Sequence, residues 1–329
     1  MISCLLLLPL AILSAASSAA KSKQGGPTSL VYQFPNLTRV ENIAVRSNGQ
    51  LLVTLLTQPE LRSINPSVPN PQASLVYQFP NATSVFGITE TEPDVFAVAT
   101  ANLSFTGAYA PKDYAVWVVN LRKHAPEVRK AASIPGSGTL NGLARLSHNT
   151  VLGSDIVAGA IHRIDLNTGN SAVVIQDDAL RAPVDLPGFG VNGIRTHGRY
   201  LYFVNIGKGL LGRIPIDSRT GAATGPVEII SDGVRGVDDF ALSKTARTVY
   251  AANLFQNALV EVASNGETEI IAGGPDGALF VGPTSAQLGR TPQDRNVVYV
   301  VSSGAVFDPS TGGFNSVEGG KVVAVKLQN

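Results

Sequence analysis

Oxygen-bearing side chains recur at the start of short apolar segments along this 329-residue chain. Glu41, Asn141, Asn192 and Asp238 each open such a segment, and Asp239 follows the last of them. Carboxylate and carboxamide oxygens suit a hard divalent cation such as Ca²⁺ or Mg²⁺. Carboxylates also exchange protons, and amides donate hydrogen bonds to a developing negative charge. One Asn-Gly pair alone is typical of a turn, so this chemistry depends on whether the four segments converge.

An internal repeat explains why these segments recur. Residues 29–36, SLVYQFPN, are repeated without change at 74–81, and looser copies open near residues 41, 87, 141, 192, 238 and 283. A period in the forties, built from about four short strands, is typical of propeller blades. A β-sandwich, the alternative, would not repeat its openings six times. The sequence therefore predicts an all-β, six-bladed β-propeller as one domain over residues 21–329.

Two consequences follow from this predicted architecture. The segments at 30–34 and 321–327 are expected to share one blade, so that the N- and C-terminal strands close the ring. The innermost strand of every blade starts near the axis, so the six openings converge on one face. Glu41, Asn141, Asn192 and Asp238 are therefore predicted as catalytic residues that share one cup.

The loops predicted between the second and third strands of each blade are apolar. They contain Leu55-Leu56, residues 103–109, Leu254-Phe255 and Val306-Phe307. An apolar rim suits terpenoid or polyketide ligands better than sugar lactones. About half of these side chains are expected to pack between blades instead, because apolar loop residues are common. The predicted substrate-binding residues are Phe105, Tyr109, Phe255 and Phe307.

The first 20 residues predict a cleavable signal peptide. An apolar run over residues 5–13 is followed by small residues up to Ala20, and no other stretch is apolar for long enough to form a stable membrane span. We therefore expect a secreted or secretory-pathway protein. Removal of the leader would remove Cys4, the sole cysteine, which excludes thiol catalysis and disulfides. Three N-x-[ST] triplets predict glycosylation at Asn36, Asn81 and Asn102.

Charge and histidine content exclude further classes. Lys and Arg number 25 and Asp and Glu 24, so no basic surplus predicts a nucleic-acid partner. The four histidines lack metal-chelating spacing, and His162 and His197 are expected to be solvated residues on strands or turns. The sequence does not specify the oligomeric state.

The blade openings resemble those of the SMP-30/gluconolactonase-type six-bladed propellers: Glu at the first, Asn-Gly at the third and fourth, and Asp at the fifth. The resemblance implies a divalent metal on Glu41, Asn192 and Asp238, with Asn141 facing the substrate. The chain reads Glu41-Asn42-Ile43, whereas that family usually continues the first Glu with Gly-Pro.

The leader, the VYQFP opening and the GVDDF segment are similar to a secreted fungal branch of such propellers that includes hetero-Diels-Alderases of natural-product clusters. This resemblance implies an intermolecular hetero-Diels-Alder or related cyclisation between a tropolone or polyketide quinone methide and a terpene such as humulene. It implies small apolar natural-product substrates and no required cofactor. Two alternatives remain: a lactonase or hydrolase that depends on Ca²⁺ or another divalent cation, and a secreted binding propeller without catalytic activity.

Overall fold

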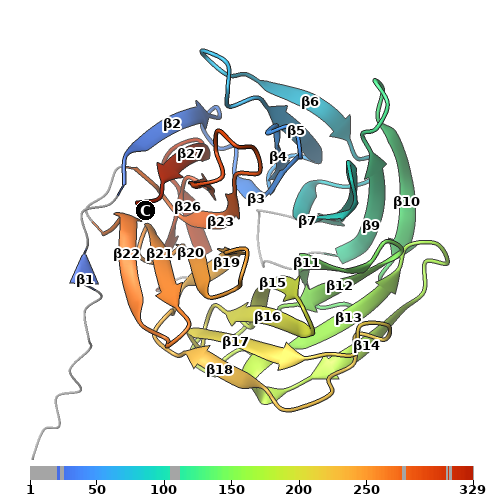
Figure 1. Cartoon of the computed structure of the whole chain (residues 1–329). Helices are drawn as coiled ribbons and strands as arrows, with labels where there is room; N and C mark the ends of the chain where they lie inside the picture. The colour runs from blue at the N-terminus through green and yellow to red at the C-terminus, as the bar shows by residue number, and fades with distance from the viewer. Residues whose placement is uncertain are drawn as a thin grey trace, which may run out of the picture.

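The computed structural model describes residues 21–22, 26–103, 112–275, 279–308, 310 and 313–328. Six sheets, five of four strands and one of five, surround a central axis like the blades of a propeller (Figure 1), which confirms the predicted all-β, six-bladed fold. The predicted leader, residues 1–20, lies outside the described residues, as do Phe105 and Tyr109. Within the described ranges no helix has the length and apolarity needed to cross a membrane.

Each blade is a meander that starts at the axis and ends at the rim. The innermost strands are β3 (Val40–Val45), β7 (Ser84–Glu92), β11 (Leu140–Ser147), β15 (Val191–His197), β19 (Val237–Leu242) and β23 (Pro283–Leu288). The second strands are β4 (Leu51–Leu55), β8 (Val95–Asn102), β12 (Thr150–Asp155), β16 (Tyr200–Asn205), β20 (Thr248–Asn253) and β24 (Val297–Ser302). The third strands are β5 (Glu60–Ile64), β9 (Lys112–Asn120), β13 (Ala160–Asp165), β17 (Leu210–Pro215), β21 (Ala258–Ala263) and β27 (Lys321–Lys326). The outermost strands are β6 (Ala73–Gln78), β10 (Glu127–Ser133), β14 (Ser171–Gln176), β18 (Glu228–Ser231), β22 (Thr268–Gly273) and β2 (Thr28–Gln33).

Three short elements lie outside this repeat. Strand β1 (Lys21–Ser22) pairs in parallel with β22 of blade five. The single-turn helix η1 (Asp178–Leu180) follows β14. In blade six, a hairpin of β25 (Ala305–Asp308) and β26 (Gly313–Ser316) is inserted between β24 and β27 and forms a sheet of its own.

The ring is closed by the two ends of the propeller, as the sequence predicts. Strand β2 pairs antiparallel with β27, from Thr28 opposite Val325 to Gln33 opposite Lys321. The identical octapeptides occupy equivalent positions, because each forms an outermost strand and the passage to the next blade. Their phenylalanines, Phe34 and Phe79, are buried. The repeat therefore marks how one blade joins the next.

A β-bulge near the start of each innermost strand prepares the site. In all six blades, the register of the pairing between the innermost and the second strand shifts close to the start of the innermost strand. A bulge re-aims a side chain out of the regular alternation. The same irregularity recurs in all six blades, at the residues that open each apolar segment.

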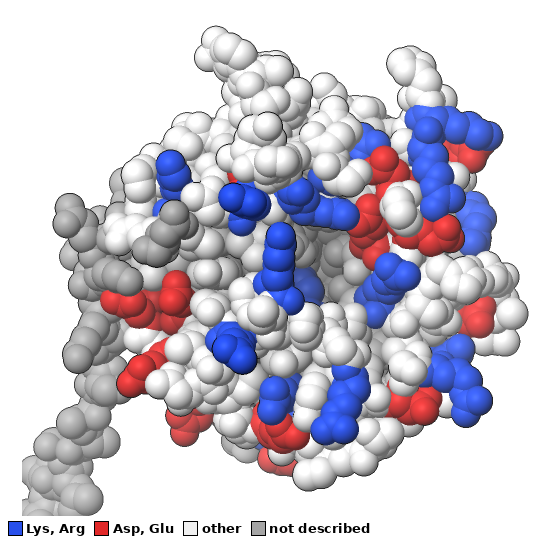
Figure 2. Space-filling model, viewed as in Figure 1, with Lys and Arg blue, Asp and Glu red and all other residues white. Residues whose placement is uncertain are grey.

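One face of the propeller carries basic side chains around the central hollow (Figure 2). Several innermost strands end in, or lead into, a basic residue: Arg46, Arg145, Arg195, Lys244 and Arg290. Three of these bind carboxylates, Arg46 to Asp94, Arg195 to Asp239 and Arg290 to Glu90. Three of these five positive charges are thus offset by carboxylates of the fold.

Candidate active site

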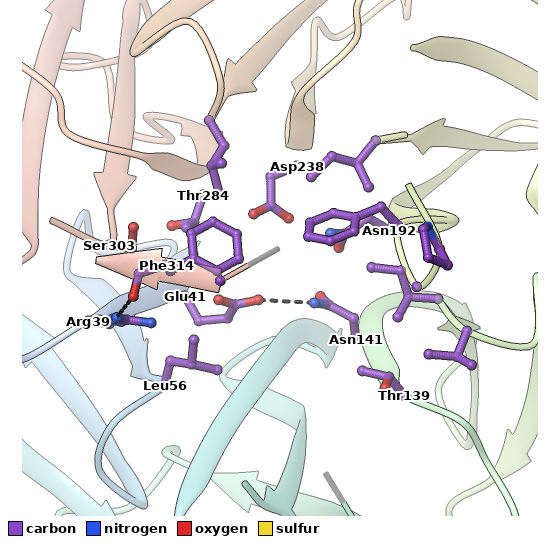
Figure 3. A pocket seen from close by; sticks show the side chains of 18 residues that line it. Arg39, Glu41, Leu56, Thr139, Asn141, Asn192, Asp238, Thr284, Ser303 and Phe314 are labelled. Atoms are coloured by element: carbon purple, nitrogen blue, oxygen red, sulfur yellow. Dashed lines mark hydrogen bonds between the residues drawn. The ribbon is translucent and has the colours of Figure 1, made fainter. Parts of the chain in front are cut away.

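A cavity of about 340 Å³ opens where the innermost strands begin (Figure 3). Glu41, Asn141, Asn192 and Asp238 all line it, and all four are buried. Side chains that lie up to 197 residues apart therefore share one cup, as the repeat predicts. Blades follow one another clockwise in Figure 1 and anticlockwise in Figure 3, so Figures 1 and 2 show the face opposite the cup.

A second layer of residues lies directly below the cup. It consists of the next residue of each innermost strand: Asn42, Gly87, Gly142, Gly193, Asp239 and Ser285. A Cβ on Gly142 would lie 2.6 Å from the Asn192 carbonyl oxygen, and one on Gly193 would lie 2.2 Å from Asp239 Oδ1. The two Asn-Gly pairs are therefore not turns. Glycine follows the cup residue because neighbouring blades approach closely at the axis.

Asp239 is the centre of the polar half of this second layer. Its Oδ2 accepts hydrogen bonds from Asn42 Nδ2 at 3.0 Å, Ser285 Oγ at 3.0 Å and Arg195 Nη2 at 2.8 Å. The four residues come from blades one, four, five and six. Asn42, at which the chain departs from the Glu-Gly-Pro pattern, thus holds the buried carboxylate beneath the cup.

The two cup carboxyls have raised pKa values. Burial raises the pKa of Glu41 to about 7, a rise that the hydrogen bond from Asn141 and the Arg39 charge partly counter and the Asp239 charge reinforces. Burial, followed by repulsion from Glu41 and Asp239, raises the pKa of Asp238 well above its usual range. Two neighbouring carboxyls that cannot both ionise easily are suited to an acid and a base role.

The two cup amides are oriented by these carboxyls. Asn141 Nδ2 donates a hydrogen bond to Glu41 Oε1 at 3.0 Å, and the Asn192 side chain donates one to Asp238. Asn192 Oδ1 is buried and has no hydrogen-bond partner among the residues that the structure describes. This acceptor can receive a hydroxyl of a substrate or coordinate a cation.

The predicted metal ligands fit a hard divalent cation in their chemistry. Glu41, Asn192 and Asp238 offer carboxylate and amide oxygens, and the unpartnered Asn192 Oδ1 needs a donor or a cation. In the part of the chain that the structure describes, no three His, Cys, Asp or Glu side chains cluster as a metal site. A cation here would therefore bind two carboxylates and an amide.

The upper wall of the cavity is apolar. Leu56 and Leu254, from two of the predicted rim loops, line it. Further apolar lining comes from Ile156, Val157, Pro187, Phe189, Ile206 and Phe314. The cup therefore combines a polar floor with an apolar wall, as an amphipathic organic ligand requires.

Four phenylalanines from three loops form one aromatic cluster at this wall. Phe255 and Phe307 stack with centroids 4.9 Å apart and planes at 21°. Phe307 also contacts Phe189 and Phe314, each at 5.3 Å. Of the four, Phe189 and Phe314 line the cavity. Phe255 and Phe307, predicted as substrate contacts, pack against the two rings that line the cavity, and their contact with a substrate stays a prediction.

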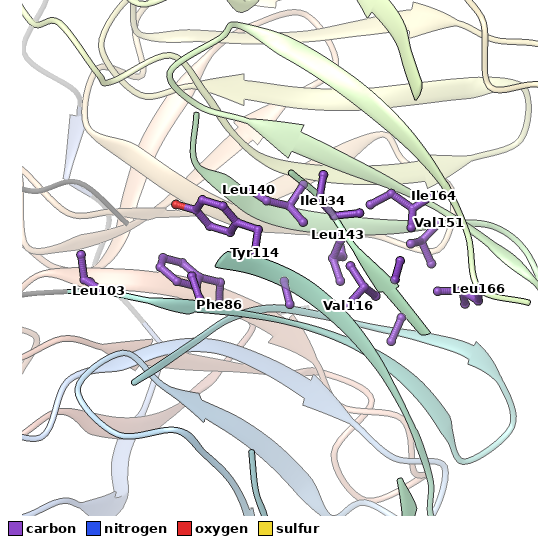
Figure 4. Packing of buried hydrophobic residues seen from close by; sticks show 14 of the residues in the cluster. Phe86, Leu103, Tyr114, Val116, Ile134, Leu140, Leu143, Val151, Ile164 and Leu166 are labelled. Carbon is purple, nitrogen blue, oxygen red and sulfur yellow. The ribbon is translucent and has the colours of Figure 1, made fainter. Parts of the chain in front are cut away.

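Some predicted rim residues pack between blades, as expected. Leu103 is 4 % exposed and joins the cluster between blades two and three, with Phe86, Leu140 and Leu143 (Figure 4). Phe86 holds the position in blade two that Glu41 holds in blade one, but it turns into this core. At this position blade two therefore contributes a buried apolar side chain instead of a polar cup residue.

The predicted glycosylation sites differ in exposure. Asn36 and Asn81 are exposed at the passages between blades, whereas Asn102 is half-buried and its Nδ2 donates a hydrogen bond to Asp113 at 3.1 Å. Glycosylation stays a prediction at all three, and Asn36 and Asn81 present the more accessible amides.

A buried carboxylate fixes the loop before Asn141. Asp155 accepts hydrogen bonds from the backbone N–H groups of Gly138 at 2.7 Å, Thr139 at 3.0 Å and Ala158 at 3.0 Å. His162 Nε2 lies 3.4 Å from it, so His162 is buried beside a carboxylate and the expectation of a solvated histidine is wrong. Burial raises the pKa of Asp155, but these partners together lower it to about 2.

This lowered pKa predicts an acid-sensitive stability. Because the folded pKa of Asp155, about 2, lies below the usual aspartate value of 3.8, the stabilisation is complete above about pH 4 and is lost as the pH falls toward 2. We expect Asp155→Asn to lower the free energy of unfolding by up to about 2 kcal/mol at pH 7. Urea unfolding of both proteins at pH 7, 4 and 2.5 checks this. A difference that does not shrink with acidification would contradict it.

Known proteins share this architecture. No protein-family model matches the chain. A protein of Sarocladium schorii named "putative hetero-Diels-Alderase asR5" is 29% identical over 315 residues, covering 83% of this chain and 77% of its own. A protein of a Phoma species, also named a putative hetero-Diels-Alderase, is 28% identical over 308 residues and covers 84% and 87%. The chain is thus a distant homologue of these fungal proteins.

Two solved structures show the same fold. The calcium-binding protein regucalcin of Agrobacterium tumefaciens superposes with a TM-score of 0.61 at 15% identity, over 92% of this chain and 96% of that one. A luciferin-regenerating enzyme superposes with a TM-score of 0.64 at 14% identity, over 92% and 95%. The chain is a six-bladed propeller with the same fold as these two proteins. At these identities the likeness concerns the fold alone.

Proposed function

We propose that this protein is an enzyme of fungal secondary metabolism that promotes an intermolecular hetero-Diels-Alder or related cyclisation. The observation that carries the proposal is one cavity with a polar floor of two carboxyls and two amides beneath an aromatic wall. The names of the two fungal relatives support the same class of reaction. The substrates we propose are an oxygenated quinone methide of tropolone or polyketide origin and an apolar alkene such as humulene.

Positioning supplies most of the rate enhancement in this proposal. The oxygenated partner binds at the floor, and the hydrocarbon lies against Phe189 and Phe314. Holding two reactants in a near-attack geometry converts a bimolecular step into an effectively unimolecular one. Asn141 donates one N–H to Glu41 and retains a second, which meets the negative charge that develops on the heterodiene oxygen.

The cup carboxyls can also generate the heterodiene. The neutral Asp238 carboxyl donates its proton to the leaving hydroxyl of a precursor, so that the carbon–oxygen bond breaks and water leaves. The Glu41 carboxylate accepts the proton of the enolic hydroxyl, the electron pair of that O–H bond forms the carbonyl, and the enolic double bond shifts to form the exocyclic double bond at the carbon that loses water. The raised pKa values of both groups favour this division of roles. The apolar wall then shields the quinone methide from water.

A rate comparison tests the proposal. Purified protein is mixed with a preformed quinone methide and humulene, and cycloadduct formation is followed against buffer and against heat-denatured protein. We expect native protein to accelerate the reaction and the cycloadduct to inhibit it. Tight binding of either substrate without acceleration would instead indicate the binding propeller.

A second candidate, a metal-dependent lactonase, is favoured by the unpartnered Asn192 Oδ1, which belongs to a residue that lines the same cavity as the Glu41 and Asp238 carboxyls. Glu41, Asn192 and Asp238 would hold the cation. A bound divalent cation would supply a Lewis acid that polarises a lactone carbonyl. The remaining cup amide, Asn141, would then orient the substrate.

Calcium titration separates the two candidates. If the cup binds Ca²⁺, a hundredfold excess over Kd should stabilise the fold by about 2–3 kcal/mol, and Asn192→Ala should remove most of that gain. The melting temperature is measured with Ca²⁺, with chelator and in the variant. A melting temperature indifferent to both additions would count against the lactonase and leave the cyclase proposal intact.

A further inference from the structure

Arg39 joins the floor of the cup to its aromatic wall. It lies two residues before Glu41 and lines the same cavity. Its Nη2 donates a hydrogen bond to the Phe314 carbonyl oxygen at 2.9 Å (Figure 3). Its Nε donates one to Ser316 Oγ at 2.9 Å. One planar guanidinium therefore holds two positions of strand β26.

The backbone of Arg39 fixes a second wall. Its N–H donates a hydrogen bond to Thr57 Oγ1 at 3.0 Å, and its carbonyl oxygen accepts one from the Leu56 N–H at 2.8 Å. Leu56 lines the cavity beside Arg39. Arg39 is thus attached to blade one through its backbone and to the blade-six hairpin through its side chain.

The hairpin needs such an attachment. Within the described ranges, strands β25 and β26 pair with each other and extend none of the six blades. An isolated two-stranded ribbon is marginally stable in water. The contacts that hold it over the cup include the aromatic cluster and the two hydrogen bonds from Arg39.

We propose that Arg39 is a positioning residue that sets the height of Phe314 above the polar floor, and so the register between the two reacting partners. The effect on the register of the reacting partners rests on the proposed cyclisation, whereas the attachment of the hairpin by Arg39 does not. This positioning requires a guanidinium, because its two parallel N–H groups define both the distance of the hairpin from Arg39 and the angle of the hairpin. A lysine at this position keeps the charge and loses this pair of parallel N–H groups.

The test compares Arg39→Lys, Arg39→Met and Ser316→Ala with Arg62→Lys as the matched control. Arg62 also donates from Nε to a side chain, at 2.7 Å, and from Nη1 to a carbonyl oxygen, at 3.2 Å, but far from the cup. Trp117, which packs against Tyr77 and Phe79, reports through its fluorescence that each variant is folded.

The first readout is amide hydrogen exchange of residues 305–308 and 313–316, which needs no substrate. We expect exchange about tenfold faster in both Arg39 variants, a smaller increase in Ser316→Ala and none in Arg62→Lys, as the loss of one or two hydrogen bonds to a charged group implies. Wild-type exchange in Arg39→Lys would overturn the proposal, because charge alone would then suffice. Ser316→Ala keeps the test decisive if an Arg39 variant does not fold.

The second readout is the enantiomeric ratio of the cycloadduct. We expect this ratio to fall in Arg39→Lys and Ser316→Ala by a larger factor than kcat/KM falls. In Arg62→Lys the ratio should stay at the wild-type value. A loosened hairpin with an unchanged ratio would also overturn the positioning role. If wild-type protein forms no cycloadduct, the proposed function fails, whereas the exchange experiment still decides whether Arg39 holds the hairpin.

Discussion

Asp238→Asn is expected to lower the rate of cycloadduct formation from a hydroxylated precursor by about 10²–10⁴-fold, the usual contribution of a general acid. With a preformed quinone methide, the same variant should retain most of the wild-type rate. The reason is that Asp238 donates a proton only when water leaves, whereas the cycloaddition itself depends on positioning. Asparagine keeps the size of the side chain and its contact with Asn192 but has no acidic proton.

The measurement is a pair of single-turnover rates, one for each substrate form, in wild type and variant. Asp232→Asn, an exposed aspartate that precedes the same innermost strand, is the matched control and should change neither rate. Equal losses with both substrate forms would contradict the acid role. Complete loss of a lactone hydrolysis would instead support the metal-dependent candidate.

Phe189→Ala should lower kcat/KM for the preformed partners by about 10- to 100-fold, the cost of a misplacement of about 1 Å. Phe189 lines the cavity, and its ring centroid lies 6.3 Å from that of Phe255, 5.3 Å from that of Phe307 and 6.3 Å from that of Phe314. Its removal therefore opens the wall to water and loosens the other rings together. Product selectivity should move toward that of the background reaction.

Phe189→Leu is the conservative control, because it retains most of the apolar volume and should retain most of the rate. Phe255→Ala should have a smaller effect than Phe189→Ala, since Phe255 supports the wall without lining the cavity. An effect of Phe255→Ala that exceeds that of Phe189→Ala would show that the assignment of supporting and lining rings is wrong.

The repeat made most of the fold and the cup floor predictable. The period in the forties fixes the number of blades, and its template places Glu41, Asn141, Asn192 and Asp238 at equivalent positions. The closure of the ring by β2 and β27 follows from the same reasoning. Periodicity is a long-range signal in a single sequence, so it identifies residues that converge although they lie far apart.

The remaining site residues lie where the repeat says little. Phe189 belongs to the connection between β14 and β15, and Phe314 to a hairpin that occurs only in blade six among the described blades. Arg39 precedes the aligned segment by two residues. The second layer below the cup could have been predicted from the sequence, because the residue after each opening is glycine in blades two to four and polar in the others.

The enantiomeric ratio of the cycloadduct tests the central claim most directly. A preformed quinone methide without stereocentres and humulene are both achiral, so the background reaction in buffer gives equal amounts of the two enantiomers. Only a cavity that holds both partners in one register can favour one of them. We predict a clear excess of one enantiomer with wild-type protein, and a decline of that excess in Phe189→Ala. Equal amounts of both enantiomers with folded wild-type protein would contradict the proposal that this cup performs the cyclisation.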